Sequence, residues 1–195
     1  MQSCMKLLMT LGIAAMLGGT TARASFFADF LSVSPAGSNF DYTYNLDFGS
    51  NNGAEELLSG DFVTIYDIVG FVSAIAGSPF SMSTQTIGIT PPFQAPPDSG
   101  SLMNVTFTYT GPTVLVNDSF TGFTIVSTDS GTQGGFSSGQ DTAVVDGMTK
   151  LGDTTGTPVP AALVSGAPEP MSLLLMGFGL LSVALLRRRR RPKLD

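Results

Sequence analysis

The stretch Phe40-Asp41-Tyr42-Thr43-Tyr44-Asn45-Leu46-Asp47-Phe48 decides the fold of this chain. An aromatic or aliphatic residue stands at every second position, with a polar residue between each pair. This period of two predicts a β-strand with one buried face and one face in water. The following segment, Gly49-Ser50-Asn51-Asn52-Gly53, predicts a turn.

Further stretches in the middle of the chain carry strand signals. Residues 61–69 are apolar on both faces, which indicates a strand near the middle of packed sheets, and residues 102–109 alternate again. β-Branched and aromatic residues recur throughout, and no long segment has a helical period. These features predict an all-β fold, an antiparallel β-sandwich ectodomain over residues 25–149.

The segments between these strands are shorter or less regular. Shorter strand candidates are residues 26–33, 80–89, 113–116, 120–127 and 142–146. Four prolines between residues 91 and 97 predict an irregular segment, because proline cannot donate to a strand ladder. Gly and Ser in residues 129–140 predict a surface loop, and Thr, Gly and Pro in residues 150–167 predict a linker.

The N-terminus carries the pattern of an export signal. Lys6 supplies a positive charge, residues 7–19 are apolar, and Ala22-Arg23-Ala24 has the small-x-small form of a signal-peptidase site. We therefore expect residues 1–24 to be a signal peptide. Cleavage after Ala24 would leave Ser25 as the first residue of the mature chain.

The C-terminus joins three kinds of sequence. The tripeptide Pro168-Glu169-Pro170 precedes an apolar run of 16 residues, 171–186. As a helix this run would be about 24 Å long, against a hydrocarbon core of roughly 30 Å, so it predicts a short single transmembrane helix. Five arginines follow and would stop transfer on the cytoplasmic side of the membrane: Arg187, Arg188, Arg189, Arg190 and Arg191.

Residues 168–195 closely resemble the C-terminal sorting signal of PEP-CTERM proteins, because the Pro-Glu-Pro tripeptide, the apolar run and the arginine cluster occur in this order at the end of the chain. The resemblance implies that the chain is an exosortase substrate. The membrane-embedded exosortase would remove the helix, and the protein would pass from the inner membrane to the cell surface or extracellular matrix of a Gram-negative bacterium. A single-span envelope protein that is never processed is the alternative.

The charge of the body differs from that of the whole chain. Residues 25–167 contain 13 acidic residues and the single Lys150, so their net charge is 1 − 13 = −12, against −6 for the whole chain. Such a surface cannot replace the counterions of phosphate groups, which argues against nucleic acid and anionic lipid as partners. Neutral polysaccharide and cations are the partners that remain.

The body has neither histidine nor cysteine. Catalytic triads with a histidine base, and metal sites built on imidazole or thiolate, are therefore excluded. Calcium takes oxygen ligands alone and stays open as a metal, with Asp129 and Asp141 at the two ends of the predicted loop as candidate ligands. A surface loop without a bound ion is the preferred interpretation, and we expect no cofactor.

A pair of carboxylates is the remaining route to catalysis, as in glycoside hydrolysis. Glu55 and Glu56 are adjacent in a polar turn, which predicts solvated side chains. Asp61 and Asp67 border the strand of residues 61–69 and are predicted to end it or to face solvent. We therefore expect none of these four residues to be catalytic.

These observations lead to one preferred hypothesis. The chain is expected to be an exported, non-enzymatic surface or extracellular-matrix protein, a structural or adhesive component associated with exopolysaccharide or a biofilm. An extracellular carbohydrate-active enzyme that uses Asp and Glu is the alternative. Signal peptidase and exosortase are the partners expected during export.

Overall fold

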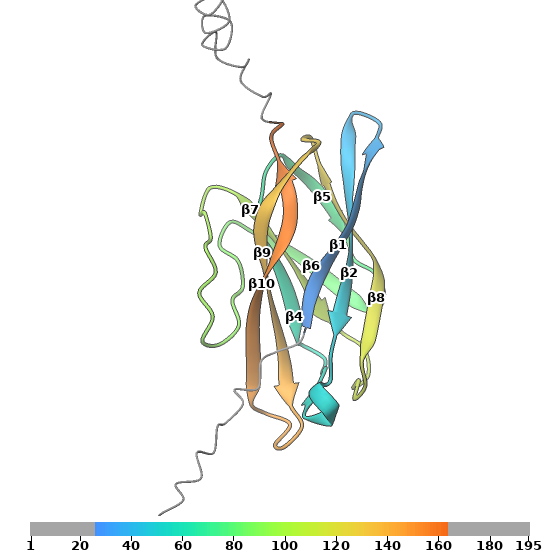
Figure 1. Ribbon diagram of the computed structural model, residues 1–195, viewed down its shortest axis with the longest axis vertical. Helices are drawn as coiled ribbons and strands as arrows, with labels where there is room; N and C mark the ends of the chain where they lie inside the picture. The colour runs from blue at the N-terminus through green and yellow to red at the C-terminus, as the bar shows by residue number, and fades with distance from the viewer. Residues whose placement is uncertain (1–25, 164–195) are drawn as a thin grey trace, which may run out of the picture.

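A computed structural model describes residues 26–163 of the 195-residue chain. Ten β-strands and one short 3₁₀ turn form this part of the chain, and it contains no α-helix (Figure 1). Two predicted segments lie outside the described residues. They are the signal peptide with Ser25, and the sorting signal with its transmembrane helix. Within residues 26–163, no helix is long and apolar enough to span a membrane.

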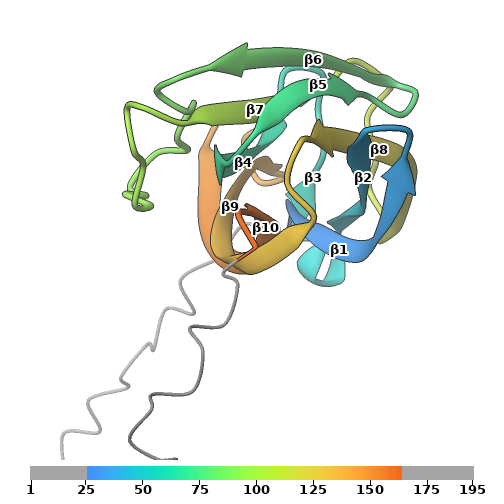
Figure 2. The same ribbon diagram turned by 90° about the horizontal axis from the view of Figure 1, so that it is seen from above.

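The strands form two antiparallel sheets that lie face to face (Figure 2). Their bounds are β1 (Phe26–Ala36), β2 (Asn39–Phe48), β3 (Glu55–Glu56), β4 (Phe62–Ile68), β5 (Phe71–Ile75), β6 (Phe80–Gln85), β7 (Met103–Tyr109), β8 (Asp118–Ser127), β9 (Gly131–Ala143) and β10 (Lys150–Ala161). The smaller sheet has the order β1-β2-β8-β5, and the larger has the order β10-β9-β4-β7-β6, with β3 paired to the end of β9. The prediction of an all-β, antiparallel fold is confirmed.

The core lies between the two sheets and is built largely from aromatic side chains. In β2, Tyr42, Tyr44, Leu46 and Phe48 are buried, as the alternating pattern predicts. Strand β4 contributes side chains from the centre of the larger sheet, where it pairs with both β7 and β9. Other core residues come from the facing strands: Phe26, Val63, Ile65, Val105, Phe107, Phe123 and Ile125.

The two lateral sides of the sandwich differ. On one side β1 packs against β9 and β10, so the smaller sheet closes onto the larger one (Figure 2). On the other side the edge strands β5 and β6 are joined through residues 76–79 but make no comparable packing with each other. The sandwich is therefore closed along β1 and has two separate strand edges along β5 and β6.

Two predictions about the second half of the chain are wrong. Residues 129–140 were predicted to form a loop, but most of them belong to β9, where glycine and serine leave room for β1 to approach. The predicted linker is a strand up to Ala161, and its twelve residues pair with β9 along their whole length. The folded domain therefore extends beyond residue 149.

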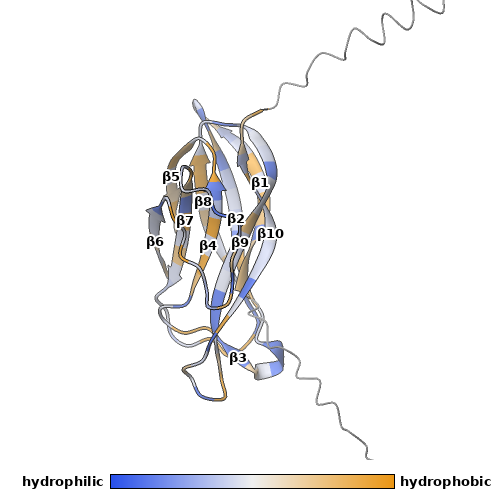
Figure 3. Ribbon diagram, turned by 90° about the vertical axis from the view of Figure 1, so that its left-hand side faces the viewer, coloured by the Kyte–Doolittle hydropathy of each residue, from blue (hydrophilic) through white to orange (hydrophobic). Residues whose placement is uncertain are grey.

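The composition of β10 explains why it is predicted as a linker. Its colouring in Figure 3 is mostly pale to hydrophilic, whereas β4 is strongly hydrophobic. Pro158 and Pro160 are tolerated because β10 is an edge strand, and residues two apart can place both ring nitrogens on the unpaired side. Pairing with β9 thus overrides the local composition of β10.

Smaller differences concern strand ends. Strand β6 ends at Gln85 rather than at residue 89, and β9 ends at Ala143, before a turn. The strand predicted at residues 113–116 is reduced to one bridge between Val114 and Leu57.

Candidate functional site

A long loop covers part of the outer face of the larger sheet. Residues 86–102, here called the Pro-rich loop, connect β6 to β7 and form the green segment beside β9 and β10 in Figure 1. Val63 and Ile65 point into the core, so Thr64 and Tyr66 of the same strand point to the outer face. Both are nevertheless almost fully buried, because the loop lies on them.

Tyr66 anchors the first part of the Pro-rich loop. Its hydroxyl donates a hydrogen bond to the backbone carbonyl of Ile89 at 2.8 Å. Its ring lies against Gly88, where an added β-carbon would stand 2.3 Å from Tyr66 Cε1. Burial raises the pKa of the Tyr66 hydroxyl above its ordinary value.

A network of amide and carboxylate groups fixes the two ends of the loop. The buried Asn104 side chain accepts from the Asp67 amide at 2.8 Å and donates to Asp98 Oδ1 at 2.9 Å. Asp98 Oδ2 accepts from the Gly88 amide, and Asp67 Oδ1 accepts from the Ser99 amide, both at 2.8 Å. Asp67 is therefore a half-buried residue that holds the loop, rather than a free carboxylate at a strand end.

Gln94 attaches the far part of the loop to β10. Its Nε2 donates to the Gly152 carbonyl at 2.8 Å, and its Oε1 accepts from Thr154 Oγ1 at 3.1 Å. Pro91 is buried, and a β-carbon at Gly152 would stand 2.5 Å from its Cβ. The loop is therefore held at its base and at its far end, and its shape is defined by side-chain bonds rather than by strand pairing.

Phe93 is the most exposed apolar residue of this loop. It lies between Pro92 and Gln94, its relative exposure is 101%, and its φ angle is +62°. A bulky residue in this left-handed region costs of order 1–3 kcal/mol, a strain that tends to occur at functional sites. Ile87 and Ile89 of the same loop are exposed as well. We take Phe93 and these two isoleucines as the candidate binding surface.

The candidate carboxylates take other roles. Asp61 is fully buried and accepts from Lys150 Nζ at 2.8 Å, from Thr142 Oγ1 at 2.9 Å and from the Leu58 amide at 2.9 Å. Glu55 is fully buried in β3, so the prediction of a solvated side chain is wrong for this residue. Asp61 borders β4, as predicted, but neither Asp61 nor Glu55 faces solvent, because β9 and β10 pack beside them. No local sequence pattern indicates that contact.

The two candidate calcium ligands are not brought together. Asp129 precedes β9, and Asp141 lies near the opposite end of that strand. Ten residues of extended chain separate Gly131 from Asp141, which amounts to about 33 Å. Within residues 26–163, no group of three acidic, histidine or cysteine side chains is placed to hold a metal ion.

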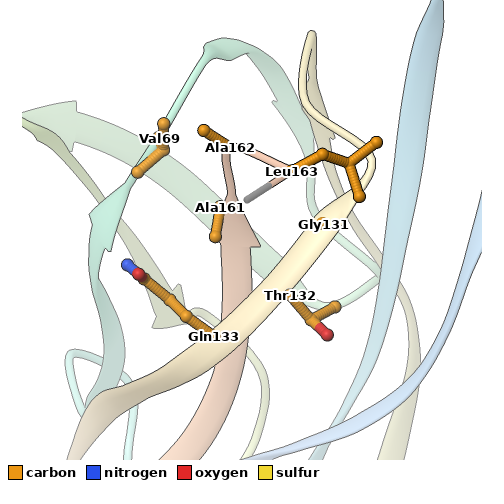
Figure 4. Close-up of a pocket in the computed structure, with 7 residues that line it drawn as sticks. All are labelled: Val69, Gly131, Thr132, Gln133, Ala161, Ala162 and Leu163. Carbon is orange, nitrogen blue, oxygen red and sulfur yellow. The ribbon is translucent and has the colours of Figure 1, made fainter. Parts of the chain in front are cut away.

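A shallow hollow of about 480 Å³ lies at the end of β10 (Figure 4). Small or apolar side chains and backbone form most of it, and no ionisable side chain lines it. The residues around it are Val69, Gly131, Thr132, Gln133, Ala161, Ala162 and Leu163. This hollow borders the last described residue, and its lining offers no group suited to catalysis.

Phe93 is not identified from the sequence, because the prolines around it indicate only a break in regular structure. The available signal was an aromatic residue placed between two Pro-Pro pairs, in Pro91-Pro92-Phe93-Gln94-Ala95-Pro96-Pro97. Comparison of the chain with models of known protein families and with curated proteins found no match. Function is therefore inferred from this geometry and from the sequence.

Proposed function

We propose that this protein is an exported surface or extracellular-matrix protein whose β-sandwich binds neutral polysaccharide through Phe93 and its neighbours on the Pro-rich loop. The proposal combines the export and sorting patterns of the sequence with the charge of the body, which is −12 for residues 25–167. A body with this charge would repel phosphate and sulfate polymers. An uncharged polymer meets no such barrier.

The signals proposed for export and sorting lie at the two ends of the chain. Signal peptidase would cleave between Ala24 and Ser25, and exosortase would act at the Pro168-Glu169-Pro170 signal while Arg187 to Arg191 hold the tail on the cytoplasmic side. The body would then leave the inner membrane for the cell surface or the matrix. Its tether is short, because β10 ends at Ala161, only seven residues before Pro168.

The exposure of Phe93 carries the binding proposal. One face of a sugar ring is lined by C–H groups, and an aromatic ring that protrudes into solvent can pack against it. The hydrogen bonds of Tyr66, Asp98 and Gln94 hold the loop before any ligand arrives, so little ordering would be needed on binding. Loop side chains on a rigid scaffold are a common arrangement for recognition.

Retention on polysaccharide tests this proposal. The processed protein from its host would be passed over the host's own exopolysaccharide, beside the variants Phe93→Ala and Met148→Ala. Met148 is 80% exposed in the turn between β9 and β10, outside the Pro-rich loop, and serves as the matched control. Loss of a central aromatic contact should weaken binding about tenfold or more, and the control should change it less than twofold.

The proposal would be overturned if the unchanged protein were not retained, or if Phe93→Ala were retained as well as the control. The same incubation separates binding from the alternative of a carbohydrate-active enzyme. New reducing ends that vanish in an Asp→Asn or Glu→Gln variant would favour the enzyme.

A further inference from the structure

One long segment of the body carries no charge. Residues 68–97 form 30 consecutive positions without Asp, Glu, Lys or Arg, in a body whose net charge is −12. This segment contains β5, β6 and the first part of the Pro-rich loop. Six of its large hydrophobic residues are exposed: Val72, Ile75, Met82, Ile87, Ile89 and Phe93. Depletion of charge together with exposed apolar residues is typical of protein interfaces.

Strand β6 is the most regular edge in this segment. Its six residues pair with β7 without a bulge, from Phe80 opposite Tyr109 to Gln85 opposite Asn104. Four consecutive residues of β6, at positions 81–84, are exposed. Its outer edge pairs with no other strand among the described residues, so it presents backbone groups that can extend the sheet.

The other three edges carry features that hinder such pairing. Strand β10 contains Pro158 and Pro160, and it packs beside β1. Strand β1 contains Pro35 and a bulge after Phe30, and the short β5 has a bulge after Phe71. Strand β6 contains no proline, no glycine, no charge and no bulge. These are the devices by which natural proteins protect sheet edges.

The core fixes the position of β6. The ring of Phe80 lies 5.1 Å from that of Tyr109 and 5.0 Å from those of Phe120 and Phe123, between centroids. These rings come from both sheets, so the start of β6 is held by the packed interior. The edge is therefore preformed and would need little ordering before it pairs.

We propose that β6 of a second copy of this chain pairs antiparallel with β6, about a twofold axis, and joins the two larger sheets into one. The unpaired backbone groups of a strand edge are matched by another extended strand. In antiparallel pairing of β6 with β6 about a twofold axis, the backbone groups of both copies form the same hydrogen bonds. Two bodies of charge −12 repel each other, and strands β5 and β6 bring no like charges of their own to a contact between two copies.

The size of the contact predicts a weak dimer. A six-residue strand with its flanking side chains buries less surface than a standard stable interface, so association would depend on high local concentration, as at a cell surface. This inference stands without the proposed polysaccharide binding. If both hold, the dimer presents two Pro-rich loops to one polymer and gains avidity from the second contact.

Cysteine cross-linking tests the pairing in the full chain expressed in its host, with Cys4 replaced by serine. Ser83 lies near the middle of β6, and Ser34 is an exposed serine of β1 that serves as the control. We expect Ser83→Cys to form a disulfide-linked species of twice the chain mass under mild oxidation, at least tenfold more than Ser34→Cys. Equal yields from the two variants would overturn the proposal.

A second pair of variants removes the dependence on disulfide geometry. In Ser83→Lys two like charges would meet at the axis, so the processed protein should become monomeric by light scattering at concentrations where Ser34→Lys still dimerises. Circular dichroism would show whether both variants keep the fold. A wild-type protein that stays monomeric at the highest concentration at which it remains soluble, or a Ser83→Cys adduct with a different protein, would also overturn pairing between two copies.

Discussion

The backbone carbonyl of Phe26 lies directly over the α-carbon of Gly139, so that a β-carbon at position 139 would stand 1.5 Å from the carbonyl oxygen. Phe26 is fully buried, and its ring lies 6.3 Å from that of Phe48 and 6.1 Å from that of Phe80. This contact places the first described residue of β1 against β9 (Figure 2). Glycine at position 139 therefore allows the sandwich to close on this side.

Substitution at this contact should be costly. Gly139→Ala must displace a strand backbone rather than a flexible side chain, and we expect a loss of about 3 kcal/mol in the free energy of unfolding. Gly134→Ala, in the same strand, meets nothing within 4 Å and should change stability by less than about 1 kcal/mol. Urea denaturation of both variants measures the difference, and equal midpoints would contradict the packing described.

The ion pair between Asp61 and Lys150 should depend mainly on the carboxylate. Asp61→Ala leaves Lys150 without its ion-pair partner and removes the acceptor for Thr142 and the Leu58 amide. We expect a loss of about 3 kcal/mol or more in the free energy of unfolding. In Lys150→Met the carboxylate keeps its other donors. Because the fully buried carboxylate loses its cation but keeps these hydrogen bonds, that change should cost about 2 kcal/mol, less than Asp61→Ala. A larger loss from Lys150→Met than from Asp61→Ala, by urea denaturation, would reverse this assignment.

Strand β10 should be indispensable for folding. A chain that ends at residue 149 loses twelve residue pairs with β9, the buried Val159, and the hydrogen bond from the Tyr44 hydroxyl to the Pro158 carbonyl. We expect this chain to lack cooperative unfolding, whereas a chain that ends at residue 163 should keep it. Near-ultraviolet circular dichroism during thermal denaturation compares the two. A cooperative transition in the shorter chain would show that β10 is a dispensable linker.

Stability should fall at high pH, in part through Tyr44. Burial raises the pKa of the Tyr44 hydroxyl above its ordinary value of 10.0. Because the folded pKa is the higher one, this contribution to stability is complete below about pH 10 and is lost as the pH rises from there toward the folded pKa. Tyr44→Phe should lose about 1 kcal/mol at neutral pH, with its hydrogen bond to Pro158, but show a shallower decline above pH 10. Denaturation series at several pH values test this, and parallel curves would count against it.

Much of the sandwich could be predicted from local pattern. The alternation in residues 40–48 identifies β2 and its buried face, and the two-sided hydrophobicity of residues 61–69 identifies β4 as a central strand. These signals suffice because each strand packs its own side chains against the core. A strand can be predicted from its own sequence where its own apolar side chains are the ones that become buried.

Strands β9 and β10 could not be predicted in this way. Their residues are mainly Gly, Ser, Thr and Pro, and they are held by pairing with each other and by the approach of Phe26 over Gly139. The contact between Phe26 and Gly139 joins parts of the chain that are distant in sequence, and no window of sequence contains both partners. The burial of Glu55 and Asp61 follows from the same strands.

The candidate binding surface depends on the same kind of long-range contact. The prolines around Phe93 indicate an irregular segment, but its attachment requires Tyr66, Asn104 and Gly152 from three other strands. Phe93 is exposed because the rest of the loop is held down. The sequence therefore predicts that a loop exists and cannot predict what it presents.

Intact-mass analysis of the native protein tests most directly whether it is exported and released, on which its proposed role in the matrix depends. We predict a mature chain that begins at Ser25 and lacks the apolar run from Met171 onward. A measured mass that accounts for all 195 residues, or for a chain that retains residues 171–186, would contradict this account.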